Sequence, residues 1–183
     1  MNPYLFPIPI SMILAVDNGN NIGKNNRLPW GHFPEDMRWF QEKTINSTML
    51  MGSNTWKSLP GKLKNRHHIV LSSKLLDKLP DTTLLNRSFE DSIRRACALS
   101  PYPKLFIIGG KRLFEEGIQF VSRVYLTRIN HLYDGDVKVN LDEILSREFY
   151  INNIDTILSK NNNIEMKFYE YVRIKKVENP GSH

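Results

Sequence analysis

The chain has 183 residues, of which 40% are apolar and 24% are charged. This is enough apolar sequence for one sizeable core, and the charge is too ordinary for a disordered or fibrous chain. Lysine and arginine outnumber aspartate and glutamate by 25 to 19, which favours an anionic partner without distinguishing a cofactor from lipid or nucleic acid. The single cysteine, Cys97, excludes an internal disulfide and a multi-cysteine zinc site, and it favours a reducing cytoplasm.

The first apolar segment, residues 8–16, predicts a buried strand. The sequence before it lacks the basic region and the cleavage pattern of a signal peptide. The segment is also far shorter than the roughly 20 residues that a membrane helix needs. Residues 179–183 look like a frayed tail or a cloning remnant, so we assign one domain to residues 1–178.

Short apolar runs alternate with helical patterns along the rest of the chain. Pro34, followed by two acidic residues, indicates the start of a helix, and Ser88 is expected to cap another that runs to about Leu99. Strands are expected at 10–16, 48–51, 68–72 and 104–108, a short helix at 111–116, and an antiparallel pair of longer strands at 124–129 and 164–174. This order predicts a single α/β domain. Its sheet would be mostly parallel and twisted, with an antiparallel C-terminal edge and helices on both faces.

Ligands of such sheets bind beyond the carboxyl ends of the strands, so the functional residues are expected in the loops after residues 16, 51, 71 and 108. Asp36, on the first predicted helix, shares a face with Trp39 and Phe40. These neighbours should desolvate the carboxylate, raise its pKa and suit it to bind a cationic or amidine-like group. The alternative is an acid that only complements the helix dipole, a role that fits the adjacent Glu35 better.

Gly109 and Gly110 follow a predicted strand and precede a predicted helix. A glycine pair at this place either brings backbone N–H groups close to a phosphate or forms a tight turn. Lys111 and Arg112, which come next, add positive charge at the same point.

A basic run covers residues 57–78, with six lysines or arginines against one acid. It is either a solvated face or a site for a phosphate dianion, to which Ser72 and Ser73 would offer hydroxyls. Only Trp56 interleaves an aromatic ring with this run, which is too few for a nucleic-acid platform. The five histidines lack metal-ligand spacing, so we predict no metal site.

The order of these motifs is more specific than any motif alone. They are Ile13-Leu-Ala-Val-Asp17, Ile22-Gly23, Leu28-Pro-Trp30, Pro34-Glu-Asp-Met-Arg-Trp-Phe40, Met51-Gly52, Thr55-Trp56, Ser72-Ser73, Ile107-Ile-Gly-Gly110 and Tyr125-Leu-Thr127. In this order they resemble the dihydrofolate reductase family over about residues 10–175. The resemblance implies hydride transfer from NADPH to C6 of 7,8-dihydrofolate and protonation at N5. The product, tetrahydrofolate, would supply one-carbon metabolism and thymidylate synthesis.

The resemblance also implies roles for individual residues. Asp36 would hold the 2-amino and N3 edge of the pterin and favour protonation of N5 by way of water. Thr127 would support it through a hydroxyl, and Leu28 and Trp30 would complete the catalytic group. The other implied substrate contacts are Ile13, Met37, Phe40, Leu59, Leu63, Ile108 and Arg66, the last of which would clamp the α-carboxylate of the glutamate tail.

The implied NADPH contacts come from several loops, and residues 21–28 would close over the nicotinamide. They are Ala15, Ile22, Gly23, Asn54, Thr55, Ser72, Ser73, Arg87, Gly109, Gly110, Lys111, Arg112, Leu113 and Phe114. Asn54 and Thr55 would begin a helix at the pyrophosphate, and the Gly109–Gly110 peptide bond would be cis. Dihydrofolate and antifolate inhibitors are the expected ligands of a cytoplasmic monomer without a nucleic-acid or membrane partner.

Ser53 and Phe114 are among the positions that depart from the family pattern. Ser53 stands where many members carry a basic residue against the 2′-phosphate, which leaves the preference for NADPH over NADH open. Phe114 replaces a common tyrosine. One alternative is a pyrimidine reductase of riboflavin synthesis, a similar fold that also uses NADPH. Another is a non-catalytic protein on the same scaffold. Asp36 and Arg66 favour the folate enzyme over the first, and Asp36 with Thr127 favours it over the second.

Overall fold

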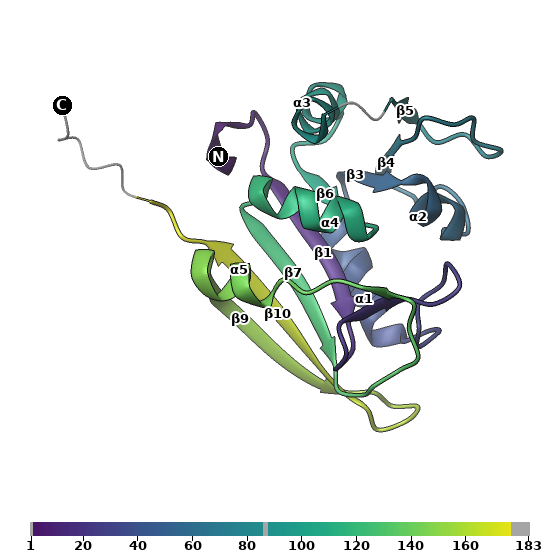
Figure 1. Ribbon diagram of the computed structural model, residues 1–183, viewed down its shortest axis with the longest axis vertical. Coiled ribbons are helices and arrows are strands. Elements are labelled where there is room, and N and C mark those ends of the chain that lie inside the picture. The colour runs from purple at the N-terminus through teal and green to yellow at the C-terminus, as the bar shows by residue number, and fades with distance from the viewer. Residues whose placement is uncertain (1, 86–87, 177–183) are drawn as a thin grey trace.

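The computed structural model describes residues 2–85 and 88–176, which form an eight-stranded sheet flanked by helices (Figure 1). The strand order is β5-β4-β3-β6-β1-β7-β10-β9. The parallel strands are β1 (Ile10–Val16), β3 (Ser47–Gly52), β4 (Arg66–Leu71), β5 (Thr82–Leu84), β6 (Leu105–Ile107) and β7 (Arg123–Ile129). Strands β10 (Glu165–Arg173) and β9 (Phe149–Leu158) complete the edge in antiparallel pairing. The predicted sheet, with its antiparallel C-terminal edge, is confirmed.

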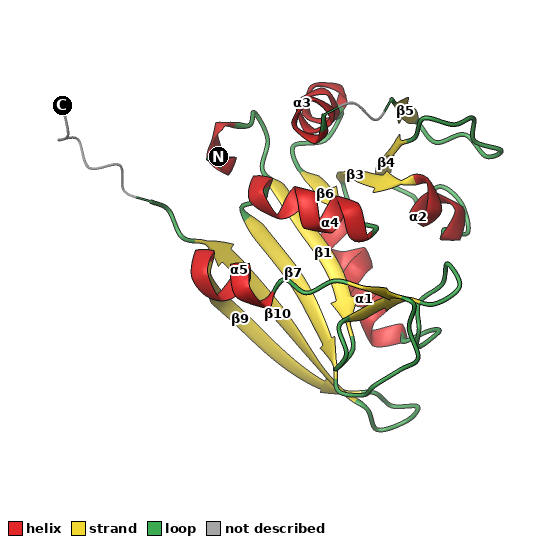
Figure 2. Ribbon diagram, viewed as in Figure 1, coloured by secondary structure: helices red, strands yellow, loops and turns green. Residues whose placement is uncertain are grey.

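Helices lie on both sides of this sheet (Figure 2). They are α1 (Pro34–Thr44), α2 (Ser53–Ser58), α3 (Phe89–Leu99), α4 (Lys111–Gly117) and α5 (Asp142–Glu148), with short 3-10 turns at Pro3–Leu5 and Ile118–Phe120. Two expected helix starts are confirmed. Pro34 is the first residue of α1, and the Ser88 hydroxyl accepts a hydrogen bond from the Asp91 amide at 3.2 Å. Among the described helices, none is long and apolar enough to cross a membrane.

The alternation of side chains along β1 separates the two faces of the sheet. Ile10, Met12, Leu14 and Val16 pack in the largest apolar cluster, together with residues of α3, α4 and α5. Ala15 points to the opposite face and joins a cluster that includes side chains of α1. The strand is therefore buried on both faces, which explains its unbroken apolar sequence. The α1 face carries the candidate site.

Several elements were not predicted from the sequence. Strand β9 forms the edge outside β10, but every residue in it after Phe149 is exposed, so it shows no apolar alternation. Strands β2 (Asn21–Gly23) and β8 (Val137–Lys138) form a small separate sheet, and β2 interrupts the long loop expected after β1. Helix α5 has only seven residues, too short for a clear helical period. The tail assigned to residues 179–183 lies outside the described part of the chain.

Candidate functional site

Asp36 and Thr127 meet at the centre of the α1 face. Asp36 lies in the first turn of α1, and Thr127 lies on β7, where it is in register with Ala15 of β1. The Thr127 hydroxyl donates a hydrogen bond to Asp36 Oδ1 at 2.7 Å. Burial raises the pKa of Asp36 to about 6, against the opposing effect of this hydrogen bond. The predicted desolvation of the carboxyl is confirmed, and a group titrating near 6 can exchange a proton at physiological pH.

Aromatic side chains form one wall beside this pair. Phe33 is buried in a cluster with Phe168, against which the partly buried Trp30, Trp39 and Ala15 pack. The indole N–H groups of Trp30 and Trp39 are buried and have no hydrogen-bond partner within the described structure. Leu28, two residues before Trp30, is 42% exposed. The structure thus anchors Trp30 in the wall and leaves Leu28 at the surface.

A second apolar cluster lies on the same face, on the strands toward the β5 edge. Its buried members are Met49, Met51, Trp56, Val70 and Leu76. Phe40, Leu59, Leu63 and Ile108 pack against it with part of each side chain accessible. Four of the residues expected to contact the substrate are therefore gathered on one surface. Ile13 shares the face of Ala15 by strand alternation, and Met37 lies half-buried next to Asp36 on α1.

Arg66 begins β4 at the end of this surface. Its guanidinium donates to the carbonyls of Lys64, at 2.7 Å, and Gln41, at 2.8 Å, and its Nε lies 3.3 Å from the Thr44 hydroxyl. Among the described residues, no carboxylate pairs with it. Burial holds the pKa of Arg66 below its usual range. The side chain is therefore a fixed cation with an uncompensated charge, which suits recognition of a carboxylate.

The Gly109–Gly110 peptide bond is cis, as expected, and lies beside the starts of two helices. The Gly52 amide, before α2, donates to the Gly109 carbonyl at 2.9 Å, and Gly110 is the N-terminal cap of α4. Gly109 has φ +126°, and a Cβ placed there would lie 3.3 Å from both Phe114 and the Thr55 hydroxyl. Neither helix has a side-chain cap, so the first N–H groups of both remain free for an anion.

The side chains expected to contact the cofactor divide into three groups. Lys111 and Arg112 are exposed and pair with acids one turn later on α4. Leu113 and Phe114 are buried in the core and pack against Gly52 and Gly109 respectively, so they shape the glycine segments rather than present free surface. The Ser72 hydroxyl is already bonded to Lys74 at both its donor and its acceptor, whereas Ser73 and Asn54 are exposed. Arg87 lies outside the described residues.

The loop expected to cover the site is anchored by Asp17, which belongs to the first sequence motif but was not predicted as a site residue. Its buried carboxylate accepts hydrogen bonds from the Gly19, Asn21 and Tyr133 amides at 2.8–2.9 Å and from the Asn21 side chain at 2.9 Å. Burial raises its pKa, but these hydrogen bonds outweigh burial and hold it below the usual value. Asp17 thus joins the loop after β1 to the loop after β7. A clue was available, because it is the only charged residue among the first 23.

The same loop is attached at a second place. Ile22 is half-buried against the main core, and Gly23 faces Val137 on β8. The Asn25 amide donates to Asp136 Oδ2 at 2.9 Å. These contacts place Ile22 and Gly23 in the small two-stranded sheet of β2 and β8, so the loop after β1 has a defined position.

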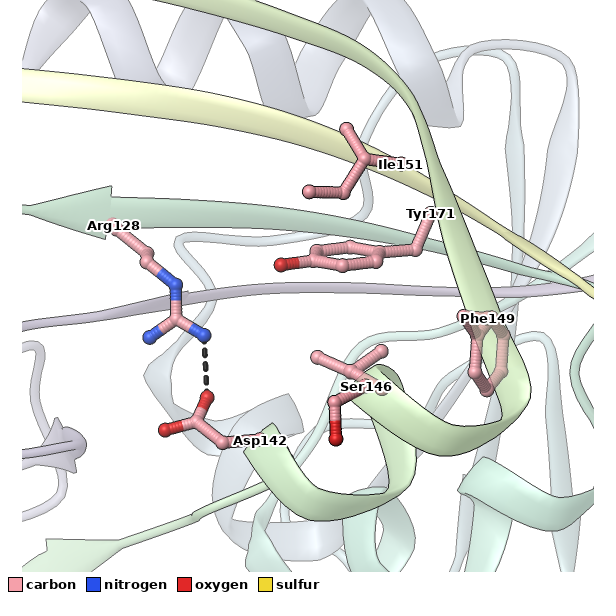
Figure 3. Close-up of a pocket in the computed structure, with 7 residues that line it drawn as sticks. Arg128, Asp142, Ser146, Phe149, Ile151 and Tyr171 are labelled. Carbon is pink, nitrogen blue, oxygen red and sulfur yellow. Dashed lines mark hydrogen bonds and ion pairs between the residues drawn. The ribbon is translucent and has the colours of Figure 1, made fainter.

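A separate pocket of about 410 Å³ lies on the other face, between α5 and strands β7, β9 and β10 (Figure 3). Its polar side consists of the ion pair between Arg128 and Asp142, and its apolar side includes Phe149 and the ring of Tyr171. None of the residues expected at the site lines it. The candidate site is therefore the α1 face, where the predicted residues converge.

Comparisons with known proteins show which class of protein shares this single-domain α/β fold and its mixed eight-stranded sheet. The solved dihydrofolate reductase from Enterococcus faecalis, complexed with NADP(H) and RAB-propyl, matches with a TM-score of 0.78 and 28% identity, covering 93% of this chain and 99% of that one. A family model described as dihydrofolate reductase matches residues 9–173.

Curated relatives give the same result. Dihydrofolate reductase type 9 of Escherichia coli is 34% identical over 136 residues, which is 72% of this chain and 76% of that protein. Dihydrofolate reductase of Bacillus subtilis is 34% identical over 128 residues, 69% of this chain and 73% of that protein. The chain belongs to the dihydrofolate reductase family. The family, the fold and the enzyme class implied by the ordered motifs are confirmed.

Proposed function

We propose that the chain reduces 7,8-dihydrofolate to 5,6,7,8-tetrahydrofolate with NADPH, and that the pterin binds on the α1 face against Asp36. The hydrogen-bonded pair of Asp36 and Thr127 carries this proposal. A carboxylate with one hydroxyl donor has acceptor sites left for the two N–H groups of an amidine-like edge. Because Asp36 is desolvated, these bonds would form in a low dielectric, where they are stronger.

Asp36 contributes to protonation at a distance. It holds the 2-amino and N3 edge, and its pKa of about 6 lets it carry a proton near neutral pH. A water molecule would pass the proton to N5, because the Asp36 carboxyl binds the opposite edge of the pterin and cannot reach N5 directly. Thr127 fixes the orientation of the carboxyl through Oδ1, and Trp30, held in the aromatic wall, bounds the same space.

The rest of the substrate fits the surface that continues from Asp36. Phe40, Leu59 and Ile108 provide apolar contacts for the pterin and benzoyl rings, and Leu63 lies at the outer end of the same cluster. The fixed and unpaired guanidinium of Arg66 would take the α-carboxylate of the glutamate tail in a bidentate contact.

The residues present fit NADPH, whose chemistry is the donation of a hydride. The uncapped starts of α2 and α4 meet at Gly109 and Gly110, where a Cβ would fill the space beside Thr55. This is a cradle for a pyrophosphate. Ala15 would receive the nicotinamide carboxamide through its backbone. The anchored loop at residues 21–28 would exclude water from the reacting rings.

We also propose that the active unit is a monomer, because the residues assigned to the site converge within one domain. A cytoplasmic location fits the buried and unpaired Cys97. Tetrahydrofolate made there would serve one-carbon transfer. We assign no nucleic acid as a partner, since the basic residues at 111 and 112 pair with acids on their own helix.

The experiment is an assay of NADPH absorbance after mixing the protein with dihydrofolate, with NADH in parallel. We expect oxidation of NADPH that a diaminopyrimidine antifolate blocks. The NADH arm shows whether Ser53 relaxes the choice of cofactor. Tight NADPH binding without turnover of dihydrofolate would contradict the proposal, and turnover of an aminopyrimidine ribitol substrate instead would favour the pyrimidine reductase.

A further inference from the structure

His68 is a fully buried histidine at the edge of the proposed substrate surface. It lies on β4, two residues after Arg66, and its ring packs 5.5 Å from that of Trp56. Both ring nitrogens are bonded. The Leu63 amide donates to Nε2 at 3.0 Å, and Nδ1 lies 2.9 Å from Asp81 Oδ2. Because Nε2 accepts, the ring proton is on Nδ1 and is donated to Asp81. Geometry therefore fixes one neutral tautomer.

Asp81 completes the arrangement from the residue just before β5. Its carboxylate also accepts from the His68 backbone amide at 2.8 Å and from Lys62 Nζ at 2.8 Å. Burial acts to raise the pKa of Asp81, but the bonds from Lys62 and His68 hold it well below its usual range. The Asp81 carboxylate thus stays ionised. It binds the His68 ring on β4 and the Lys62 ammonium from the segment that precedes β4.

That segment, residues 59–66, carries the outer part of the proposed substrate surface. The His68–Asp81 pair holds it at Lys62 and Leu63, and Lys78 Nζ holds its start by donating to the Leu59 carbonyl at 3.0 Å. The Lys64 carbonyl in the same segment is one of the acceptors that fix the Arg66 guanidinium. A shift of the backbone at residues 62–64 would therefore move Leu63 and the Arg66 guanidinium together.

We propose that His68 and Asp81 are positioning residues that set specificity for the tail of the substrate. They fix residues 59–66 so that Leu63 and Arg66 face the benzoyl-glutamate part of dihydrofolate. The inference rests on the proposed function, because it takes the tail to bind at Arg66. It also gives the basic run at residues 57–78 a different role from a phosphate site, since Lys62 and Lys78 hold this segment.

The test uses two substitutions at one position. His68→Phe keeps a ring beside Trp56 but removes both nitrogens, whereas His68→Gln keeps an acceptor near the position of Nε2. We expect the KM for dihydrofolate to rise about tenfold in His68→Phe, on the scale of one lost hydrogen bond to the part-buried Leu63 amide, and to stay within about threefold of wild type in His68→Gln. The KM for NADPH and the kcat at saturation should change less than about twofold in both variants.

A tail-less substrate separates positioning from general support of the fold. With dihydropteroate, which keeps the benzoyl group but lacks the glutamate, we expect a smaller loss of kcat/KM in His68→Phe than with dihydrofolate, because the contact at Arg66 is missing in both proteins. An equal loss with both substrates would overturn the proposal. If His68→Phe does not fold, Asp81→Asn decides between positioning of the substrate tail and general support of the fold. A rise in KM confined to dihydrofolate supports the proposal, and unchanged constants with both substrates overturn it.

Hydrogen exchange of the Leu63 amide gives a readout that needs no turnover. We expect protection in wild type and in His68→Gln and faster exchange in His68→Phe, with the β3 amides unchanged. Equal exchange in all three proteins would overturn the inference. A wild-type protein that fails to reduce dihydrofolate would instead overturn the proposed function, while the exchange data would still report on how the segment is held.

Discussion

Two carboxylates on the same side of the sheet are used in opposite ways. Asp36 receives one hydrogen bond, from Thr127, and burial raises its pKa to about 6. Asp81 is also partly buried, but it receives three, two from His68 and one from Lys62, and its pKa is held well below the usual range. Asp36 is the more deeply buried of the two and has one donor, whereas Asp81 is more accessible and has three donors, one of them a lysine. Burial and donor number together therefore separate a carboxylate that can still bind and exchange protons from one that supports structure.

The largest loss of activity should follow removal of the Asp36 carboxylate. Asp36→Asn should lower kcat/KM for dihydrofolate by at least about 100-fold near neutral pH, because it removes an acid-base group and an acceptor for the pterin edge. Steady-state kinetics measure this loss. Circular dichroism and NADPH binding serve as controls and should match wild type. Undiminished turnover would contradict the proposed role of Asp36 in binding and protonating the pterin.

Arg66 resembles Asp36 in one respect, since it also lacks a charged partner among the described residues and is free to bind the substrate. Arg66→Lys should raise the KM for dihydrofolate by about tenfold, because a lysine cannot make the bidentate contact. The kcat should change little. Dihydropteroate provides the matched control, and an equal rise in its KM would show that Arg66 does not contact the tail.

Thr127→Val tests how far a single donor controls the Asp36 carboxyl, because it removes the hydroxyl that donates to Asp36. That hydrogen bond lowers the pKa of Asp36, so its loss should raise the pKa above about 6. We expect a loss of activity of about fivefold to tenfold, on the scale of one hydrogen bond to a charged group. The shape of the pH–rate profile measures the shift, and a midpoint that stays in place would contradict the assigned role. Thr127→Ser, which keeps the hydroxyl, is the control.

The two carboxylates should also change stability with opposite signs. The folded-state pKa of Asp36 is raised, so its contribution to the free energy of unfolding becomes less favourable as pH rises from about 4 to 6, by on the order of 1–3 kcal/mol. The pKa of Asp81 is lowered, so its contribution is present above about pH 4 and is lost as pH falls below it.

Urea unfolding of Asp36→Asn and Asp81→Asn across this pH range tests the prediction. Relative to wild type, Asp36→Asn should gain stability between pH 4 and 6, and Asp81→Asn should lose most above pH 4. Parallel curves for the two variants would contradict the assignment.

Local patterns alone point to Asp36 and the glycine pair of the candidate site. Asp36 was identifiable because a helix start, flanking aromatic residues and a carboxylate fall within seven residues of sequence. Gly109 and Gly110 were identifiable because they separate a strand from a helix. The strands with two buried faces were predicted for the same reason, since burial dictates an unbroken apolar run.

What could not be predicted depends on partners distant in the sequence. Asp17 binds the distant Tyr133 amide in addition to its local bonds with Gly19 and Asn21, and His68 acquires its role from Asp81 across a strand pair. Neighbouring residues therefore could not predict either long-range contact. In the sequence, His68 reads as one more member of a basic run, although it is fully buried. Strand β9 is held by pairing with β10 rather than by its own apolar pattern.

The most direct test of the central claim is an NMR titration of carbon-13-labelled aspartate carboxyl groups, with Asp36→Asn and Asp81→Asn used for assignment. The account predicts that the Asp36 carboxyl titrates near pH 6, while the Asp81 carboxyl remains ionised below the range of an ordinary aspartate. Two carboxyls that titrate together at the ordinary aspartate pKa would contradict it.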